Sequence, residues 1–197
     1  MKMPSLDYLF LKLQAIVLLI LGRKRAALER FEVMATRTPT DRYVMASRAH
    51  LLGELGDKHG AIDLLEQITR LHPDESAGWF NLGYMLDDVG RTAQAEPAFR
   101  RALAVEPKMD RAWYGLALVL IRQRRFDEAV EALKKNTELQ PMSPFGWYQL
   151  ARVHVDRQQP DEAVKIIRHL KGFEPKVAAQ LERETGLRLA QVSRTDG

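Results

Sequence analysis

Residues 110–143 read DRAWYGLALVLIRQRRFDEAVEALKKNTELQPMS, and the same signals return in phase 34 residues to either side. The clearest signal is a proline that occupies one place in every period. These prolines are Pro39, Pro73, Pro107, Pro141 and Pro175. A period of this length indicates a stacked array of short repeats in place of a single globular core.

The overall composition is that of an ordinary folded chain. Of the 197 residues, 46% are hydrophobic and 28% are charged, which argues against global disorder. The formal net charge is +4, but acids and bases are interleaved along the chain, so a nucleic-acid partner is not expected. The chain has no cysteine, which excludes disulfides, cysteine metal ligands and a thiol nucleophile.

Five periods cover residues 8–177, and each contains two apolar runs with helical spacing. The predicted repeats are 8–41, 42–75, 76–109, 110–143 and 144–177. In each one, a glycine or polar turn ends the first run and the period-marking proline closes the second. Each repeat is therefore predicted to form two antiparallel helices. The predicted C-terminal helix, 176–185, is stopped by Gly186 and caps the array, so residues 178–197 hold the end of that helix and a flexible tail from Ser193.

This pattern resembles the tetratricopeptide repeat, whose unit carries W-x2-L-G-x2-Y, then Ala, Phe and Pro. The matching motifs are Trp79-x2-Leu82-Gly83, Trp113-x2-Leu116-Ala117 and Trp147-x2-Leu150-Ala151. The resemblance implies an all-α fold, a right-handed α-solenoid of antiparallel helix pairs with a C-terminal capping helix. Small residues at the eighth and twentieth places of a repeat would let the paired helices approach closely. A large residue at the twenty-fourth place would fill the gap beside them.

Three positions depart from the family pattern. Arg48 stands where leucine is usual, Asn136 stands where alanine is usual, and Pro97 falls inside a predicted second helix. Proline has no N–H to donate to the Ala93 carbonyl, and its ring crowds that group. We therefore predict a kink or a late helix start at Pro97.

Residues 1–21 are the unusual part of the chain. Leu6–Leu21 reads LDYLFLKLQAIVLLIL and is followed by Gly22 and three basic residues, 23–25. A secretory signal fits poorly, because Lys12 interrupts the apolar region and no small-residue cleavage site follows. A membrane span would be short, since sixteen helical residues cover about 24 Å of a hydrocarbon core of about 30 Å. Repeat phase makes this segment the first helix of the first repeat.

A helix that is apolar nearly all round is normally buried against something. A membrane, a partner protein and a second copy of the chain are all open as the surface that it contacts, and so is a terminal cap that contacts nothing further. The residues predicted to dock there are Leu9, Phe10, Leu13, Ile16, Val17, Leu18, Leu19, Ile20 and Leu21. If this segment spans a membrane, the basic cluster would place the repeats in the cytoplasm. We expect a cytoplasmic location, with membrane association on the cytoplasmic face as an open alternative.

The family resemblance also implies that a peptide, helix or loop of a partner protein binds on the concave face lined by the first helices. By repeat phase, the predicted groove residues are Tyr43, His50, Phe80, Tyr84, Asp87, Asp88, Arg111, Tyr114, Leu118, Arg122, Phe145, Tyr148 and Arg152. Aromatic side chains that the core does not require are good binding candidates. The arginine side chains could bind carboxylates of a partner through two hydrogen bonds, or they could form ion pairs with nearby aspartate residues of the same chain.

The sequence contains no phosphate loop, no G-x-S-x-G or H-E-x-x-H motif and no paired metal-ligand spacing. We predict no catalytic residue, no metal site and no cofactor. The leading hypothesis is a non-enzymatic interaction scaffold or adaptor, an accessory or assembly factor docked to a membrane or membrane complex by its N-terminal helix. The alternative is a structural subunit of a larger complex or a self-assembling array.

Overall fold

The computed structural model describes residues 5–187, and this part of the chain is helical, with turns but no strand. The first helices of the five repeats are α1 (Leu6–Ile20), α3 (Arg42–Glu54), α5 (Ser76–Asp88), α7 (Asp110–Arg122) and α9 (Pro144–Asp156). The second helices are α2 (Lys24–Arg37), α4 (Lys58–Leu71), α6 (Thr92–Val105), α8 (Phe126–Leu139) and α10 (Pro160–Lys171), and α11 (Pro175–Thr185) follows them. The predicted all-α solenoid class is confirmed. The tail predicted from Ser193, like residues 1–4, lies outside the described residues.

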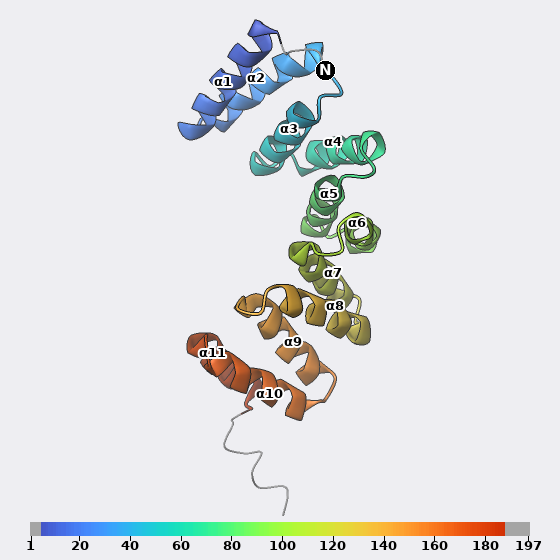
Figure 1. Cartoon of the computed structure of the whole chain (residues 1–197), viewed down its shortest axis with the longest axis vertical. Coiled ribbons are helices and arrows are strands. Elements are labelled where there is room, and N and C mark those ends of the chain that lie inside the picture. Colours follow the sequence, from blue (N-terminus) through green and yellow to red (C-terminus); the bar gives the residue numbers. More distant parts are fainter. Residues whose placement is uncertain (1–4, 188–197) are drawn as a thin grey trace, which may run out of the picture. The chain divides into compact units, whose positions relative to one another are not determined.

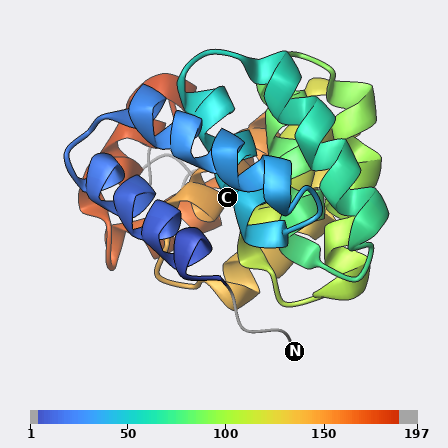
Figure 2. The ribbon, with the colours of Figure 1, turned by 90° about the horizontal axis from the view of Figure 1, so that it is seen from above.

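The helices form two compact units, Met1–Val105 and Glu106–Gly197. In the first unit, α1 to α6 form three hairpins, and each helix packs on the next one along the chain (Figure 1). Figure 2 shows α1 and α2 side by side in blue. In the second unit, α7 to α10 form two hairpins, and α11 contacts both α10 and α9.

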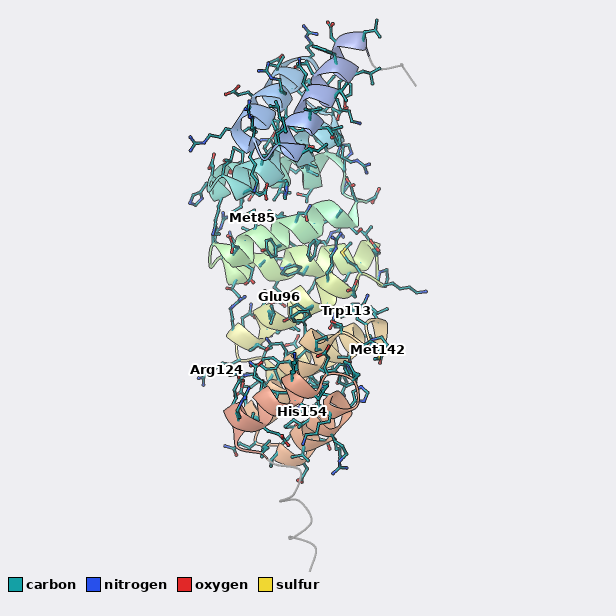
Figure 3. The ribbon with its side chains drawn as sticks, turned by 90° about the vertical axis from the view of Figure 1, so that its left-hand side faces the viewer. Met85, Glu96, Trp113, Arg124, Met142 and His154 are labelled. Atoms are coloured by element: carbon teal, nitrogen blue, oxygen red, sulfur yellow. The ribbon has the colours of Figure 1, made fainter. Side chains whose placement is uncertain are left out.

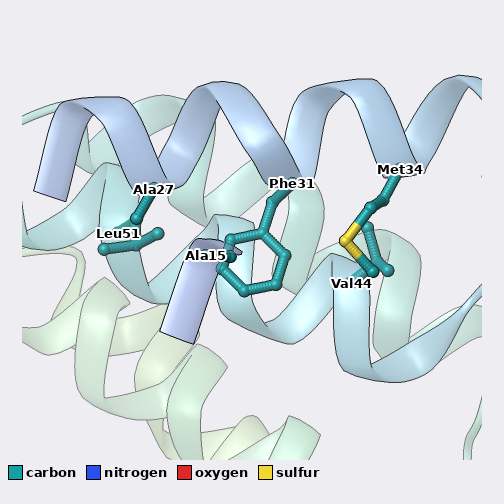
Figure 4. Packing of buried hydrophobic residues seen from close by; sticks show 6 residues of the cluster. All are labelled: Ala15, Ala27, Phe31, Met34, Val44 and Leu51. Carbon is teal, nitrogen blue, oxygen red and sulfur yellow. The ribbon is translucent and has the colours of Figure 1, made fainter. Parts of the chain in front are cut away.

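The predicted small residues lie where the two helices of each repeat meet. The eighth and twentieth places are buried in every repeat: Ala15 and Ala27, Ala49 and Ala61, Gly83 and Ala95, Ala117 and Ala129, Ala151 and Ala163. The twenty-fourth places are filled by large buried side chains, namely Phe31, Leu65, Phe99, Leu133 and Ile167. Figure 4 shows the Phe31 ring beside Ala15 in the first repeat. Each hairpin therefore closes around one bulky residue between two small ones.

A hydrogen bond links the tryptophan of one repeat to the proline that ends the repeat before it. The indole Nε1 of Trp79 donates to the carbonyl of Pro73, and Trp113 and Trp147 bond to Pro107 and Pro141 in the same way, all at 2.8 Å. The proline has no N–H of its own, but its carbonyl is a full acceptor. Tryptophan and proline therefore recur together because they are partners in one contact.

The turn inside each repeat has one conformation whatever its sequence. Positive φ angles recur every 34 residues, at Gly22, Gly56, Gly90, Arg124 and Gln158. In every case the N–H of the next residue donates to the carbonyl five residues back, at 2.8–2.9 Å, which is the Schellman closure of a helix. Arg124 has φ 58° and Gln158 has φ 59°, so two side chains occupy a conformation that favours glycine. The Arg124 side chain is exposed and extends away from the ribbon (Figure 3).

Two of the departures from the family pattern have clear structural outcomes. Arg48 forms a double hydrogen bond with Glu32 on α2, at 3.0 and 2.8 Å, so this charged side chain replaces an apolar contact with an ion pair. Of the two outcomes predicted at Pro97, the late helix start is wrong, because α6 begins at Thr92 and runs through the proline. The kink stays a prediction. The Ala93 residue that loses its hydrogen bond is exposed, so water can solvate its carbonyl.

The third departure, Asn136, is compensated by a neighbour. Its buried amide donates to the Asp110 carbonyl at 2.9 Å, and a side chain on Gly146 of α9 would collide with its amide oxygen. Ile68 of α4 and Gly78 of α5 repeat this arrangement, since a Cβ on Gly78 would lie 3.1 Å from the isoleucine. A larger residue late in one repeat is thus matched by glycine early in the next.

Replacing Arg124 by glycine should stabilise the chain by about 0.5–1 kcal/mol, because glycine adopts positive φ without strain. Urea unfolding followed by circular dichroism measures the change. Gly56→Ala, at φ 94°, is the control and should destabilise the chain. An unchanged or lower midpoint for Arg124→Gly would contradict the strain assigned to this turn.

Gly146→Ala should destabilise the chain by about 1–3 kcal/mol, because the new methyl group overpacks against Asn136. Asn136→Ala in the same chain should remove most of that penalty, since the pair then has two small residues. Thermal or urea unfolding of both single variants and the double variant gives the coupling energy. Simple additivity of the two single effects would show that the glycine does not compensate for the asparagine.

Candidate functional site

A hollow of about 260 Å³ opens on the first unit between α3 and α5. Three predicted groove residues, His50, Phe80 and Tyr84, line it. The other lining residues are Ala46, Ala49, Leu65, Asn81 and Met85. Its walls are mainly apolar, and its polar groups are the His50 ring, the Asn81 amide and the Tyr84 hydroxyl. The structure therefore brings together residues that repeat phase placed on one face.

The aromatic side chains of the hollow differ in how firmly they are held. The Phe80 ring lies 5.9 Å from the buried Phe99 ring and 6.4 Å from the Tyr84 ring, so it bridges the core and the surface. Tyr84 is 59% exposed although it is a large apolar residue. Phe80 thus fixes the wall, and Tyr84 presents free aromatic surface beside it.

Tyr43 lies nearer to the N-terminus of the same unit and is partly covered. The Lys12 ammonium of α1 lies 4.2 Å from the centre of its ring, and Phe31 meets its edge. Beside it, the Tyr8 hydroxyl donates to Asp41 at 3.2 Å. Burial, followed by the charge of Asp41, raises the pKa of Tyr8 to about 12. These contacts tie α1 to α3 and leave Tyr43 less available to a partner than Tyr84.

Two ion pairs link neighbouring repeats near the turns that join the two helices of each repeat in the first unit. Lys24 contacts Glu54 at 2.9 Å, and Lys58 contacts Asp88 at 2.6 Å, so each pair joins one repeat to the next. The hydrogen bond from Lys24 lowers the pKa of Glu54. His50 lies 3.4 Å from the same Glu54 carboxylate. Asp88 is therefore an inter-repeat ion-pair partner, although it was predicted as a groove residue.

In the second unit, the predicted groove residues fall into two groups. Tyr114 and Leu118 are half-buried on α7, while the exposed Arg111 and Arg122 each have a partner within the structure. On α9, the Phe145 ring is 68% exposed. The two remaining residues, Tyr148 and Arg152, are hydrogen-bonded to Glu184 of α11 at 2.6 and 3.2 Å.

The outward face of α1 is apolar along its whole length. Its residues Leu9, Phe10, Leu13, Ile16, Val17, Leu19 and Ile20, with Leu21 just after the helix, are between 37% and 78% exposed. Leu18 is the exception, because it packs inward on the core cluster around Phe31 and so does not belong to the predicted docking surface. Ala15 is fully buried on the same inward face. Within residues 5–187, no helix is both long and apolar enough to cross a membrane.

Repeat phase did not predict several residues that line the hollow of the first unit or contact Tyr148 and Arg152 in the second. In the first hollow they are Ala49, Leu65, Asn81 and Met85, which come from the flanks of the helices. In the second unit they are Gln180 and Glu184 of α11, which are four residues apart and therefore share one helix face. The spacing of four residues between Gln180 and Glu184 is the signal for this shared face that the sequence contains. Within the described residues, no group of three or more potential metal ligands is close enough to hold a metal.

Solved structures with the same architecture cover most of the chain. The structure described as "MamA RS-1 ArsTM double mutant" has a TM-score of 0.80 and 19% identity, and the match covers 91% of this chain and 97% of that one. The structure of MamA 41-end from Desulfovibrio magneticus RS-1 has a TM-score of 0.78 and 20% identity, and the match covers 91% of this chain and 97% of that one. The structure of YrrB, "a TPR protein with an unusual peptide-binding site", has a TM-score of 0.74 and 16% identity, and the match covers 86% of this chain and 88% of that one. At these identities the likeness concerns the fold alone.

No curated protein matches the chain at a significant level. The sequence profile of the tetratricopeptide repeat matches residues 47–88 and 86–144. These ranges contain α4 to α8 and the larger part of α3. The helix bounds, the small residues and the turn conformation continue the same period on both sides. The chain belongs to the tetratricopeptide repeat family.

Proposed function

We propose that this chain is a non-enzymatic protein-interaction scaffold that holds a peptide, helix or loop of a partner protein against its first helices. The hollow between α3 and α5 is the observation that supports this function most directly, because predicted groove residues line it. A structural neighbour, YrrB, is described as having a peptide-binding site, which is consistent with a peptide partner here.

The size and chemistry of the hollow favour a partner side chain over a small-molecule ligand. Its volume of about 260 Å³ lies below the range of about 300–1,000 Å³ that is usual for drug-sized ligands. An apolar side chain would contact Tyr84 and Met85, while the Asn81 amide could bond to the backbone of the same segment. The site therefore suits one bulky apolar residue of a peptide.

The exposed face of α1 supports a second part of the proposal, that the scaffold is docked through this helix to a membrane or membrane complex. The apolar face is continuous, and α1 is held on its other side by Ala15 and Leu18. Arg23 and Arg25 follow the helix and are exposed, so they would suit an anionic surface. The alternative is that two copies of α1 cover each other in a self-assembling array or a larger complex.

Tyr84→Ala should weaken peptide binding at least about tenfold, because exposed aromatic residues in a hollow are typical binding hot spots. Peptides selected from a random display library on the wild-type chain, then titrated by fluorescence anisotropy, provide the measurement. Leu71→Ala is the matched control, since Leu71 is also exposed in the first unit but does not line the hollow. Equal affinities for wild type and Tyr84→Ala would reject the hollow as the binding site.

The double substitution Phe10→Glu and Leu13→Glu should abolish docking through α1 without disturbing its packing, because both side chains are exposed. Flotation with phosphatidylglycerol vesicles measures membrane docking, and light scattering over a concentration series measures self-association. Val33→Glu, an exposed apolar position on α2, is the control. A wild-type chain that neither floats nor associates would contradict a docking role for this helix.

A further inference from the structure

The last repeat carries a carboxylate of its own chain on its predicted binding face. Glu184 of α11 accepts hydrogen bonds from the Tyr148 hydroxyl at 2.6 Å and the Arg152 guanidinium at 3.2 Å. Gln180, one turn earlier on α11, donates to the other carboxylate oxygen at 2.8 Å. Both α9 residues were predicted to contact a partner, and here a segment of the same chain occupies them.

Tyr148 and Arg152 form a small carboxylate-binding surface. They are four residues apart on α9, so they share a helix face, and Arg152 also donates to the Tyr148 hydroxyl at 3.1 Å. Hydrogen bonds from Tyr148, then from Gln180, lower the pKa of Glu184, and the Tyr148 hydrogen bond raises the pKa of Arg152. The pair is therefore suited to an ionised carboxylate.

An apolar hollow lies directly beside this surface. It has a volume of about 260 Å³ and is lined by Pro144, Phe145, Tyr148, Val177 and Gln180. Phe145 forms the most exposed part of its wall. Tyr148 belongs both to the hollow and to the carboxylate contact. A segment with an apolar side chain next to a carboxylate would therefore fit both features at once.

Glu184 can leave without detaching α11. The Arg152 and Glu184 side chains are 51% and 35% exposed, and exposed ion pairs of this kind contribute little stability. The helix itself is held elsewhere, by the fully buried Ala178 and Leu181 and by the 2.9 Å ion pair between Glu182 and Lys171 of α10. An incoming carboxylate would thus compete with Glu184 for the hydrogen bonds of Tyr148 and Arg152, and not with the packing that holds α11.

We propose that the Tyr148–Arg152 surface binds an acidic segment of a partner protein, and that Glu184 occupies this surface in the absence of the partner. The partner carboxylate replaces that of Glu184, and an adjacent apolar side chain enters the hollow beside Phe145. This inference rests on the proposed scaffold function and specifies the chemistry of the segment that the last repeat accepts.

Glu184→Gln removes the competing charge while keeping the size of the side chain. The probe is the acetylated, amidated peptide Glu-Leu-Phe-Glu, titrated into the full chain and followed by NMR at the backbone amides of α9, which every variant retains. The affinity should rise about 2–5-fold, the range expected when an exposed ion pair no longer competes. Glu182→Gln is the matched control on the same helix and should give no increase, because Glu182 is the ion-pair partner of Lys171 on α10.

Two further measurements make the result specific. The neutral peptide Gln-Leu-Phe-Gln should show no gain with Glu184→Gln, and adding Arg152→Met should cancel the gain of the acidic peptide. Equal affinities of the two Gln variants for the acidic peptide, or an equal gain for the neutral peptide, would overturn the proposal. Binding of selected peptides that depends on Tyr84 but not on Glu184 would keep the scaffold function and reject only this surface.

Discussion

The fold depends on the close approach of two helices at one small pair of residues in each repeat. The eighth and twentieth places are alanine or glycine in all five repeats, and all ten residues are buried. Small residues at both places leave room for one large side chain, and fully buried side chains such as Phe31 and Leu133 occupy that room. Stacking follows from this geometry, because a closed hairpin still has apolar surface that only a neighbouring hairpin covers.

The repeat period predicted the fold in detail because the same packing problem recurs every 34 residues. What it could not predict were the places where two residues adjust to each other. Asn136 looked like a departure from the pattern, yet Gly146 makes room for it. Pro97 was expected to kink its helix or delay the helix start, but α6 starts at Thr92, because the loss of one hydrogen bond at an exposed position is too little to unwind it.

The helices that carry the proposed binding face follow from repeat phase, but the contacts of each side chain on them do not. Repeat phase assigns Tyr84 and Tyr148 to equivalent faces, and in the structure Tyr84 is exposed whereas Tyr148 is hydrogen-bonded to Glu184. The same applies to Asp88, which pairs with Lys58. Partners of this kind come from neighbouring elements, and their position depends on helix packing that a one-dimensional period does not contain.

The bond between each tryptophan and the preceding proline has a consequence for how such a chain can change in length. Its donor and acceptor are six residues apart and lie across the boundary between two repeats. Removing residues 110–143 as a block would bring Trp147 to the same six-residue distance from Pro107. Gain or loss of whole repeats therefore preserves the contact at the new junction, whereas an insertion of any other length within that six-residue segment breaks it.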